Sequence, residues 1–225
     1  MEQMTLLSVS VGRPKGVSYQ DRRGREKITS TGIFKEPVSS RVMLRATNLE
    51  GDGQADLVGH GGPDKAAYVY SREYYDYWAK ELGRTDFATA SQFGENFTVT
   101  GMTDDVIAVG DVFRIGTALV QVTQPRVPCF KLGIRMGIEG FQKQFAASLR
   151  VGFYLRVLEE GMVGAGDTIT RQDQDPVGMT VRHMMNLLYF DPDNVEDAKR
   201  ALGIEALSPG WRGSFEERVA KAGDT

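Results

Sequence analysis

The stretch DVFRIGTALVQVT, residues 111–123, has the pattern of a β hairpin. Two apolar runs, residues 112–115 and 118–122, flank the pair Gly116-Thr117. Glycine in the first position of a two-residue turn favours type II′, whose twist suits antiparallel strands. Further short runs that predict strands, broken by glycine, recur through the first three quarters of the chain. They predict a mixed α/β protein that is mainly β, with a barrel-like or sandwich core.

Two helices interrupt the expected strands. The first follows Ser71, a residue that can cap a helix, and stops at Gly83. The second covers residues 138–149. Both segments carry large aromatic side chains at helical spacing, among them Trp78 and Phe145. Such stripes are more often core than cofactor contacts, so we expect them to pack inward.

The hydrophobic period becomes helical in the last part of the chain. Asp175-Pro176 has the form of an N-cap followed by proline at the first helical position. A second helix is expected to begin at Asp193 or Asn194, and Ser214 opens the capping box of a third. Three short helices with short connections predict a small bundle.

The composition is that of an ordinary globular protein. Of the 225 residues, 41% are hydrophobic and 25% are charged, which suits one large domain with a small appendage. Together with the change of period, this predicts a barrel-like domain over residues 1–172 and a three-helix domain over residues 173–225. The formal net charge of −3 gives no reason to expect nucleic acid or an anionic membrane as a partner.

The expected cellular compartment of the protein and the redox state of its cysteine depend on the absence of targeting and membrane-spanning patterns in the sequence. No stretch approaches the roughly 18 consecutive apolar residues of a transmembrane helix. Residues 1–12 lack the pattern of a signal peptide. We therefore expect a cytoplasmic protein, in which Cys129, the only cysteine, stays a reduced thiol. A single cysteine also excludes an intramolecular disulfide and a zinc site of four thiolates.

Cys129 lies in the segment QPRVPCFK, residues 124–131. Pro125 and Pro128 each fix one backbone angle and favour extended conformations for the residues that precede them. The segment should therefore present Cys129 in a stiff turn at the end of a strand.

Three cations, Arg126, Lys131 and Arg135, lie close to this cysteine in sequence. Positive neighbours favour thiolate over thiol, and thiolate is the form that attacks or binds a metal. The same cations could hold the phosphate of a cofactor. A buried cysteine that acts as a small hydrophobe is the alternative, and the residues alone leave both open.

A glycine-rich stretch, GHGGPDKA at residues 59–66, contains His60. Its glycines supply no side chains for packing, and they let backbone N–H groups approach a ligand closely. The spacing and ending of a Walker phosphate-binding motif are absent. The alternatives are a sharp surface turn with an exposed histidine, or a pair of His60 with Cys129.

Two further features carry polar groups. In FGENFT, residues 93–98, Asn96 can both donate to and accept from a heterocycle edge. A bulge or turn with solvated side chains is the alternative there. The basic run Arg22, Arg23, Arg25 and Lys27 is either a solvated loop or a flap that meets an anionic ligand.

Taken together, these motifs resemble the MOSC family (the molybdenum cofactor sulfurase C-terminal domain), in its YiiM-like branch. The matching segments, in the order of the family, are residues 27–38, 51–56, 60–66, 93–96, 110–111, 123–132, 152–158 and 167–169. The C-terminal helices resemble the small α-helical domain of this branch. Asp104 stands where the family often has glutamate. We expect this position to lie far from the motifs and attach no functional cost to it.

The resemblance implies a barrel-like fold that binds a pterin-based molybdenum cofactor. Cys129 matches the cysteine ligand of the metal, and thiolate is a soft donor suited to a redox metal. The residues that match the family's cofactor motifs are His60, Asp64, Lys65, Asn96, Thr123, Arg126, Lys131 and Arg135. We expect Arg126, Lys131 and Arg135 at the phosphate, and His60 and Asn96 near the pterin or the substrate.

The resemblance also implies a reaction, the reduction of N-hydroxylated compounds such as hydroxylaminopurines to amines. His60 is then the expected proton donor. The sequence has no flavin or nicotinamide fingerprint, so a separate reductase is expected to supply electrons. Two other functions stay open, a carrier of the molybdenum cofactor and a sulfur carrier with a persulfide on Cys129. The exposed helical faces are compatible with a homodimer.

Overall fold

The computed structural model describes residues 3–21, 23–56, 61–85, 87 and 90–223. Its strands are β1 (Thr5–Val11), β2 (Lys15–Gln20), β3 (Glu26–Thr31), β4 (Glu36–Val38), β5 (Val42–Leu44), β6 (Ala67–Ser71), β7 (Phe97–Thr100), β8 (Val112–Ile115), β9 (Ala118–Pro125), β10 (Phe153–Glu159), β11 (Gly161–Val163) and β12 (Ile169–Asp173). Its helices are α1 (Glu73–Glu81), α2 (Phe130–Met136), α3 (Phe141–Ala147), α4 (Val181–Tyr189), α5 (Val195–Ala201) and α6 (Pro209–Gly223), with a 3-10 turn, η1 (Pro63–Lys65).

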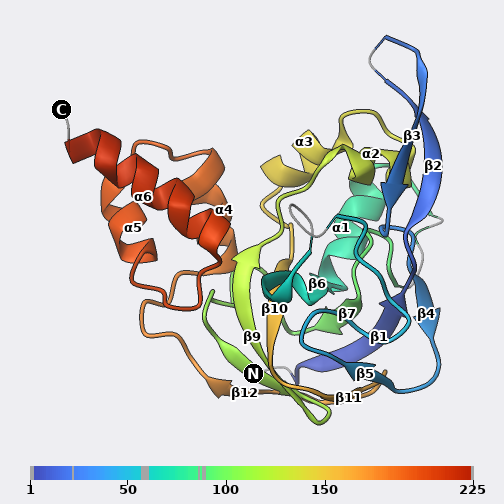
Figure 1. The fold of residues 1–225 in the computed structure, drawn as a ribbon, viewed down its shortest axis with the longest axis horizontal. Coiled ribbons are helices and arrows are strands. Elements are labelled where there is room, and N and C mark those ends of the chain that lie inside the picture. Colours follow the sequence, from blue (N-terminus) through green and yellow to red (C-terminus); the bar gives the residue numbers. More distant parts are fainter. Residues whose placement is uncertain (1–2, 22, 57–60, 86, 88–89, 224–225) are drawn as a thin grey trace.

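One curved sheet of eight strands forms the body of the protein (Figure 1). Its order is β12-β8-β9-β10-β6-β7-β1-β4, and all pairs are antiparallel except β6 with β7. The sheet curls until Thr5 of β1 forms an isolated bridge with Thr168, just before β12. In the described residues this contact does not extend into a ladder, so the core is barrel-like without being a closed barrel. The expectation of a mixed α/β fold that is mainly β is confirmed.

The predicted hairpin is present as β8 and β9. Ile115 pairs with Ala118 across the Gly116-Thr117 turn. Gly116 has a φ of 55° and Thr117 has no positive φ, as a type II′ turn requires. A Cβ at position 116 would also lie 2.3 Å from the carbonyl oxygen of Met162. Glycine is therefore needed here for both conformation and space.

Helices α1 and α3 pack their aromatic faces on one end of the sheet, as their sequences predict. Trp78 of α1 stacks on Phe145 of α3, with ring centroids 5.4 Å apart. Its indole N–H donates to the Tyr70 hydroxyl at 2.7 Å. Ser71 does not cap α1, because it is the last residue of β6 and its hydroxyl donates to the Glu73 carboxylate.

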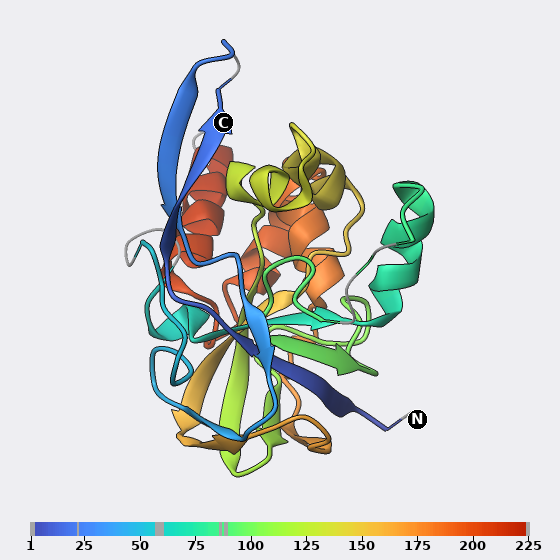
Figure 2. The ribbon, with the colours of Figure 1, turned by 90° about the vertical axis from the view of Figure 1, so that its right-hand side faces the viewer.

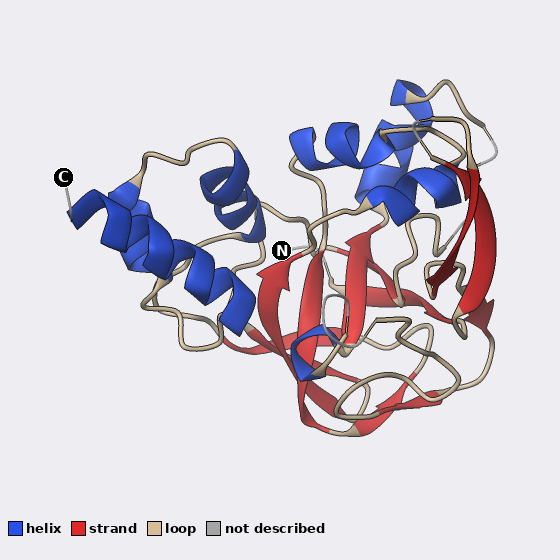
Figure 3. Ribbon diagram, turned by 45° about the horizontal axis from the view of Figure 1, so that its top comes forward, coloured by secondary structure: helices blue, strands red, loops and turns tan. Residues whose placement is uncertain are grey.

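The three C-terminal helices form a separate group on another side of the sheet (Figure 3). Two of their predicted starts are wrong. Asp175 accepts a hydrogen bond from Val177 N in a turn, and α4 begins later, capped by Thr180. Helix α6 begins at Pro209, and Ser214 donates to a carbonyl one turn earlier inside it. Both side chains make local hydrogen bonds, Asp175 in a turn before α4 and Ser214 within α6, so neither marks the start of its helix.

The basic run lies at the tip of the β2–β3 hairpin, which projects from the body (Figure 2). Arg25 pairs with Asp21 at 2.7 Å across the tip, and Lys27 lies 3.8 Å from the same carboxylate. The side chains of Arg25 and Lys27 are exposed, and both cations lie near the partly buried Asp21 carboxylate. The part of the run that the structure describes is therefore a solvated hairpin tip. Arg22 lies outside the described residues.

Candidate functional site

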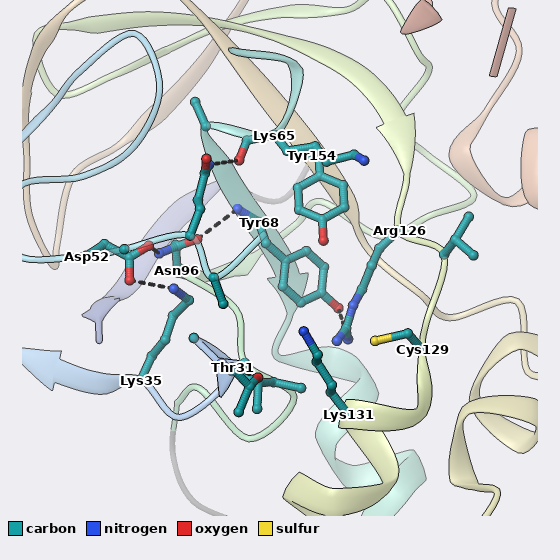
Figure 4. A pocket seen from close by; sticks show the side chains of 18 residues that line it. Thr31, Lys35, Asp52, Lys65, Tyr68, Asn96, Arg126, Cys129, Lys131 and Tyr154 are labelled. Carbon is teal, nitrogen blue, oxygen red and sulfur yellow. Dashed lines mark hydrogen bonds and ion pairs between the residues drawn. The ribbon is translucent and has the colours of Figure 1, made fainter. Parts of the chain in front are cut away.

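A cavity opens where the end of β3, the loop after β5, and strands β6 and β10 approach the segment between β9 and α2 (Figure 4). Its lining includes one thiol, four cations and two tyrosines. These side chains are Lys35, Lys65, Tyr68, Arg126, Cys129, Lys131 and Tyr154. Residues from distant parts of the sequence thus meet at one place.

Cys129 lies at the cavity wall, directly before α2. Strand β9 ends at Pro125, and Cys129 keeps an extended backbone, with φ −114° and ψ 174°. Its carbonyl accepts a hydrogen bond from Leu132 N in the first turn of the helix. The segment is thus a strand-to-helix connection, and α2 was not predicted. The thiol is partly exposed in the cavity, so the interpretation of Cys129 as a core residue is wrong.

Arg126 is a buried cation beside this thiol. Only 6% of the residue is exposed. Its Nη1 donates to the Tyr68 hydroxyl at 3.2 Å, and its guanidinium lies 4.5 Å from the centre of the Tyr68 ring. Figure 4 shows the sulfur of Cys129 directed toward this guanidinium.

In the described part of the chain, no carboxylate forms an ion pair with Arg126. Burial works against its charge, but the electrostatic influence of Tyr68, Tyr154 and Cys129 outweighs burial and raises the pKa of Arg126. A buried charge without a counter-ion is costly. The cavity therefore favours an anionic occupant.

Two lysines add positive charge to the same cavity. Lys131, on the first turn of α2, directs its ammonium group toward Arg126 (Figure 4). Lys65 ends the η1 turn and is half-buried, and burial lowers its pKa. Three cations from three elements thus surround one space. This arrangement fits an anion that is larger than a single carboxylate.

A third lysine, Lys35, belongs to a buried hydrogen-bond network on another wall. Its Nζ lies 2.5 Å from Oδ1 of Asp52. Asp52 also accepts from Gly12 N and from Asn96 Nδ2, each at 2.9 Å. Burial lowers the pKa of Lys35, and the neighbouring Asp52 opposes that shift. The network holds the loop after β5 against β1 and closes this side of the cavity.

Neither a membrane helix nor a protein metal cluster is found in the described residues. None of the helices there is long and apolar enough to cross a membrane. Likewise, no group of three or more His, Cys, Asp or Glu side chains among them is arranged to hold a metal.

Comparison with known families extends this picture to most of the chain. Residues 56–170 match the MOSC domain, and residues 179–222 match the YiiM-like, 3-alpha helix domain. The chain belongs to the MOSC family. The resemblance stated from the sequence, including the YiiM-like branch, is confirmed.

Curated relatives of this MOSC protein come from bacteria and a fungus. An uncharacterized protein, YflK of Bacillus subtilis (strain 168), is 41% identical over 96% of this chain and 95% of its own. Protein YiiM of Escherichia coli (strain K12) is 34% identical over 84% of each chain. A protein named reductase from Gibberella moniliformis is 34% identical over 75% of this chain, which spans 31% of that protein.

Solved structures agree with the fold. The crystal structure of YiiM from Geobacillus stearothermophilus has a TM-score of 0.80 and 32% identity. It covers 96% of this chain and 99% of its own. The barrel-like sheet and the C-terminal helices are therefore shared along almost the whole chain of this MOSC protein.

The MOSC motif residues divide into those in the cavity and those that support it. Lys65, Arg126, Cys129 and Lys131 line it. Asn96 also borders it, but its Oδ1 accepts from Tyr68 N, and its Nδ2 donates to Ser10 O as well as to Asp52. Within the protein, Asn96 thus joins three separate segments.

Three of the expected cofactor residues do not line this first cavity. The Thr123 hydroxyl is buried and donates to the carbonyl of Asp64 at 2.7 Å. The Asp64 carboxylate pairs with Arg156 at 2.5 Å. Arg135 donates to the carbonyl of Ser91 and lies over the ring of Phe34, 5.1 Å from its centre. Their assignment as cofactor contacts stays a prediction.

The glycine-rich motif is described only from Gly61 onward, and His60 lies outside the described residues. Gly62 N donates to Oε1 of Gln54 at 3.0 Å. A Cβ at Gly61 would lie 2.4 Å from the same oxygen. The glycines therefore permit a close backbone approach to a protein amide, and the approach to a ligand stays a prediction.

The FGENFT motif is buried rather than solvated. Glu95 has no exposed surface, accepts from Phe93 N at 2.9 Å and receives a hydrogen bond from the Tyr75 hydroxyl. Burial raises the pKa of this carboxyl. The interpretation of this stretch as a turn with solvated side chains is therefore wrong.

Asp104 is also closer to the site than its sequence position indicates. Its Oδ2 accepts from Val151 N and Gly152 N at 2.7 and 2.9 Å. The carbonyl of Gly152 in turn accepts from Arg126 N at 2.9 Å. The expectation that this substitution lies far from the motifs is wrong in space, because the turn before β10 joins Asp104 to the arginine segment.

Four cavity residues were missed as functional candidates. Tyr68 and Tyr154 lie in apolar strands, where the sequence predicts that they belong to the hydrophobic core. Lys35 and Asp52 lie within matching segments but carry no distinctive spacing of their own. The one signal that could have pointed to Lys35 and Asp52 is their charge within turn-like stretches. Many surface residues share this property, so it does not identify a site.

Proposed function

We propose that this MOSC protein is a molybdenum-cofactor-dependent oxidoreductase that reduces N-hydroxylated compounds to amines. The observation that carries the proposal is the buried guanidinium of Arg126, without a carboxylate partner among the described residues, beside the only thiol of the chain. A phosphate-bearing metal cofactor would supply both the missing anion and a partner for the thiolate. The MOSC match and the relative named reductase support this assignment.

The residues present fit such a group. Cys129 would be the protein ligand of the metal, and Arg126, Lys131 and Lys65 would hold its negative charge. When bound, the cofactor would supply two-electron redox chemistry at the metal. Tyr68 would hold Arg126 in place through the hydrogen bond at 3.2 Å, and the Lys35–Asp52 pair would keep the opposite wall closed.

The reaction consumes two electrons and two protons. The N–O bond of the hydroxylamine breaks, one proton forms a new N–H bond on the nitrogen, and the other joins the hydroxyl oxygen, which leaves as water. Electrons would come from a separate reductase, since the chain has no flavin or nicotinamide fingerprint. His60 is kept as the proposed proton donor to the leaving oxygen.

Metal analysis of protein from a cofactor-competent host tests the ligand. We expect about one molybdenum per chain in the wild type and a loss of at least about tenfold in Cys129→Ser, because a hydroxyl is a poor soft ligand. Lys131→Ala should also lower the content, whereas Lys143→Ala, an exposed lysine on α3, should not. Equal content in Cys129→Ser and wild type would overturn the assignment.

A reduction assay with 6-hydroxylaminopurine and a chemical electron donor tests the reaction. Turnover by the wild type and none by Cys129→Ser is the expected result. Bound molybdenum without turnover would instead indicate a cofactor carrier. Labile sulfur on Cys129, with activity that does not depend on molybdenum, would indicate a persulfide carrier.

A further inference from the structure

The turn before β10, residues 150–152, holds Arg126 at both of its ends. At the backbone end, Arg126 N donates to the carbonyl of Gly152 at 2.9 Å. At the side-chain end, the guanidinium donates to the Tyr68 hydroxyl (Figure 4), and that hydroxyl donates to the carbonyl of Val151 at 2.8 Å. This turn therefore fixes where the buried positive charge of the cavity lies.

Asp104 binds the same turn through its N–H groups. Oδ2 of Asp104 accepts from both Val151 N and Gly152 N, at 2.7 and 2.9 Å. Two successive backbone N–H groups directed at one anion form a small concavity that favours negative charge. Glycine is needed at position 152, because its φ is 69° and a Cβ there would collide with the carbonyl oxygen of Val69. The turn is thus built around the carboxylate of Asp104.

A continuous chain of hydrogen bonds leads from Asp104 to Arg126. Gly152 N and Val151 O belong to one peptide group. Its N–H donates to Asp104 and its carbonyl accepts from Tyr68, whose oxygen accepts in turn from Arg126. Burial raises the pKa of Tyr68, so this hydroxyl keeps the proton that it donates. Linked hydrogen bonds polarise one another, and an ionised end group strengthens them. The charge of Asp104 therefore makes the Tyr68 oxygen a better acceptor for the guanidinium.

A second chain of hydrogen bonds begins at the same carboxylate and ends in the core. Val151 N donates to Asp104, and the carbonyl of that peptide group, which belongs to Arg150, accepts from the Tyr70 hydroxyl at 3.0 Å. The Tyr70 oxygen accepts from the indole N–H of Trp78 at 2.7 Å. The two chains have the same chemistry, but one ends at a cation of the cavity and the other at a core tryptophan.

The Asp104 carboxylate is unfavourable for the fold. It has no exposed surface, and its Oδ1 has no hydrogen-bond partner in the described part of the chain. Burial raises the pKa of Asp104 to about 7, because the folded protein disfavours its charged form. An asparagine would offer the turn an acceptor oxygen without this charge. Stability alone therefore does not explain the presence of a carboxylate here.

We propose that Asp104 is a positioning residue for Arg126. Its negative charge acts through the peptide group of residues 151–152 and the Tyr68 hydroxyl, and it holds the guanidinium in place at the cavity wall. Asp104 itself does not line the cavity. The inference rests on the proposed function for the role of Arg126 toward an anion, but the position of the guanidinium can be measured in the cofactor-free chain.

Tyr68→Phe and Tyr70→Phe are a matched pair, because each removes one hydroxyl from one of the two chains of hydrogen bonds. Hydrogen exchange of the Arg126 guanidinium protons reports how firmly this group is held. Heteronuclear NMR of the cofactor-free full chain measures it, and Arg126→Met assigns the signals. We expect exchange to become at least about tenfold faster in Tyr68→Phe, which loses the acceptor, and to change by less than about twofold in Tyr70→Phe.

Asp104→Asn tests the charge itself and should fold, because it removes a buried charge. Exchange at Arg126 should become about fivefold faster although the unfolding free energy at pH 7 rises. A merely structural residue would give faster exchange only together with a lower unfolding free energy. Calorimetry with inorganic phosphate should show affinity about fivefold weaker in Asp104→Asn, unchanged in Tyr70→Phe and lost in Arg126→Met.

Equal exchange at Arg126 in Asp104→Asn and the wild type would overturn the proposal, as would equal effects of Tyr68→Phe and Tyr70→Phe. A phosphate affinity that rises in Asp104→Asn would show that the carboxylate acts only by repelling anions, and would also overturn it. If the wild type bound no phosphate, the anion site of the proposed function would fail, and the exchange rates would still decide whether Asp104 positions Arg126.

Discussion

Lys35 and Asp52 form an ion pair at the cavity wall with only 8% and 3% of their side chains exposed. Buried pairs of this kind depend on both partners, since either charge alone is left without compensation. Because the pair lies in the cavity wall, its loss should lower the stability of the fold and also alter the wall of the site.

Lys35→Met should destabilise the protein by about 3–5 kcal/mol, because it leaves the Asp52 carboxylate buried and unpaired. Urea unfolding measures the change. The control is Arg45→Met, which breaks a 2.6 Å pair with Glu50 whose side chains are 48% and 54% exposed. That loss should stay below about 1 kcal/mol. Equal losses in the two variants would show that the buried pair has no special structural role.

Arg126→Met should separate binding from stability. The guanidinium has no ion pair in the described residues, so its removal should lower the unfolding free energy of the cofactor-free protein by no more than about 1 kcal/mol. Molybdenum content should fall at least about tenfold, since a buried counter-charge for the cofactor is lost. A large loss of stability with normal molybdenum content would instead assign Arg126 a structural role.

Asp104→Asn should change how stability depends on pH. Burial raises the pKa of Asp104 to about 7, so the folded state holds this proton more tightly than the unfolded chain does. The contribution of Asp104 is therefore favourable below pH 4 and is lost as the pH rises toward 7. Relative to wild type, Asp104→Asn should gain stability between pH 4 and 8, by at most about 4 kcal/mol.

The neighbouring Asp105 provides the control for that experiment. A hydrogen bond from Thr103 lowers the pKa of Asp105, so its contribution is present above its unfolded pKa and is lost as the pH falls. Asp105→Asn should therefore lose stability relative to wild type at neutral pH. A difference between Asp104→Asn and wild type that does not vary with pH would contradict the assignment.

Arg25→Ala should leave molybdenum content unchanged and alter stability by less than about 0.5 kcal/mol. Arg25 pairs with Asp21 at the exposed tip of the β2–β3 hairpin and does not line the cavity, and exposed pairs contribute little. Metal analysis and thermal unfolding check both points. A clear drop in molybdenum content would show that the hairpin closes over the site as a flap.

Local patterns predicted the elements whose signals lie within one segment. The Gly116-Thr117 turn needs a positive φ at its first residue, and any chain with that pair between apolar runs is biased toward a hairpin. The helical spacing of the aromatic residues around Trp78 and Phe145 likewise predicted the two helices that carry them. Two helix starts were predicted at the wrong residue. Aspartate and serine side chains make similar hydrogen bonds in turns, at helix starts and inside helices, and the sequence does not distinguish these places.

The family and the mainly β fold could be predicted from the sequence, because the motifs and strand patterns that carry them are contiguous along the chain. The burial of Arg126 without a carboxylate partner in the described residues and the pairing of Lys35 with Asp52 became visible in the folded structure alone. Each is a relation between segments that are distant in sequence. Burial and charge compensation arise from such contacts, and no local pattern encodes them.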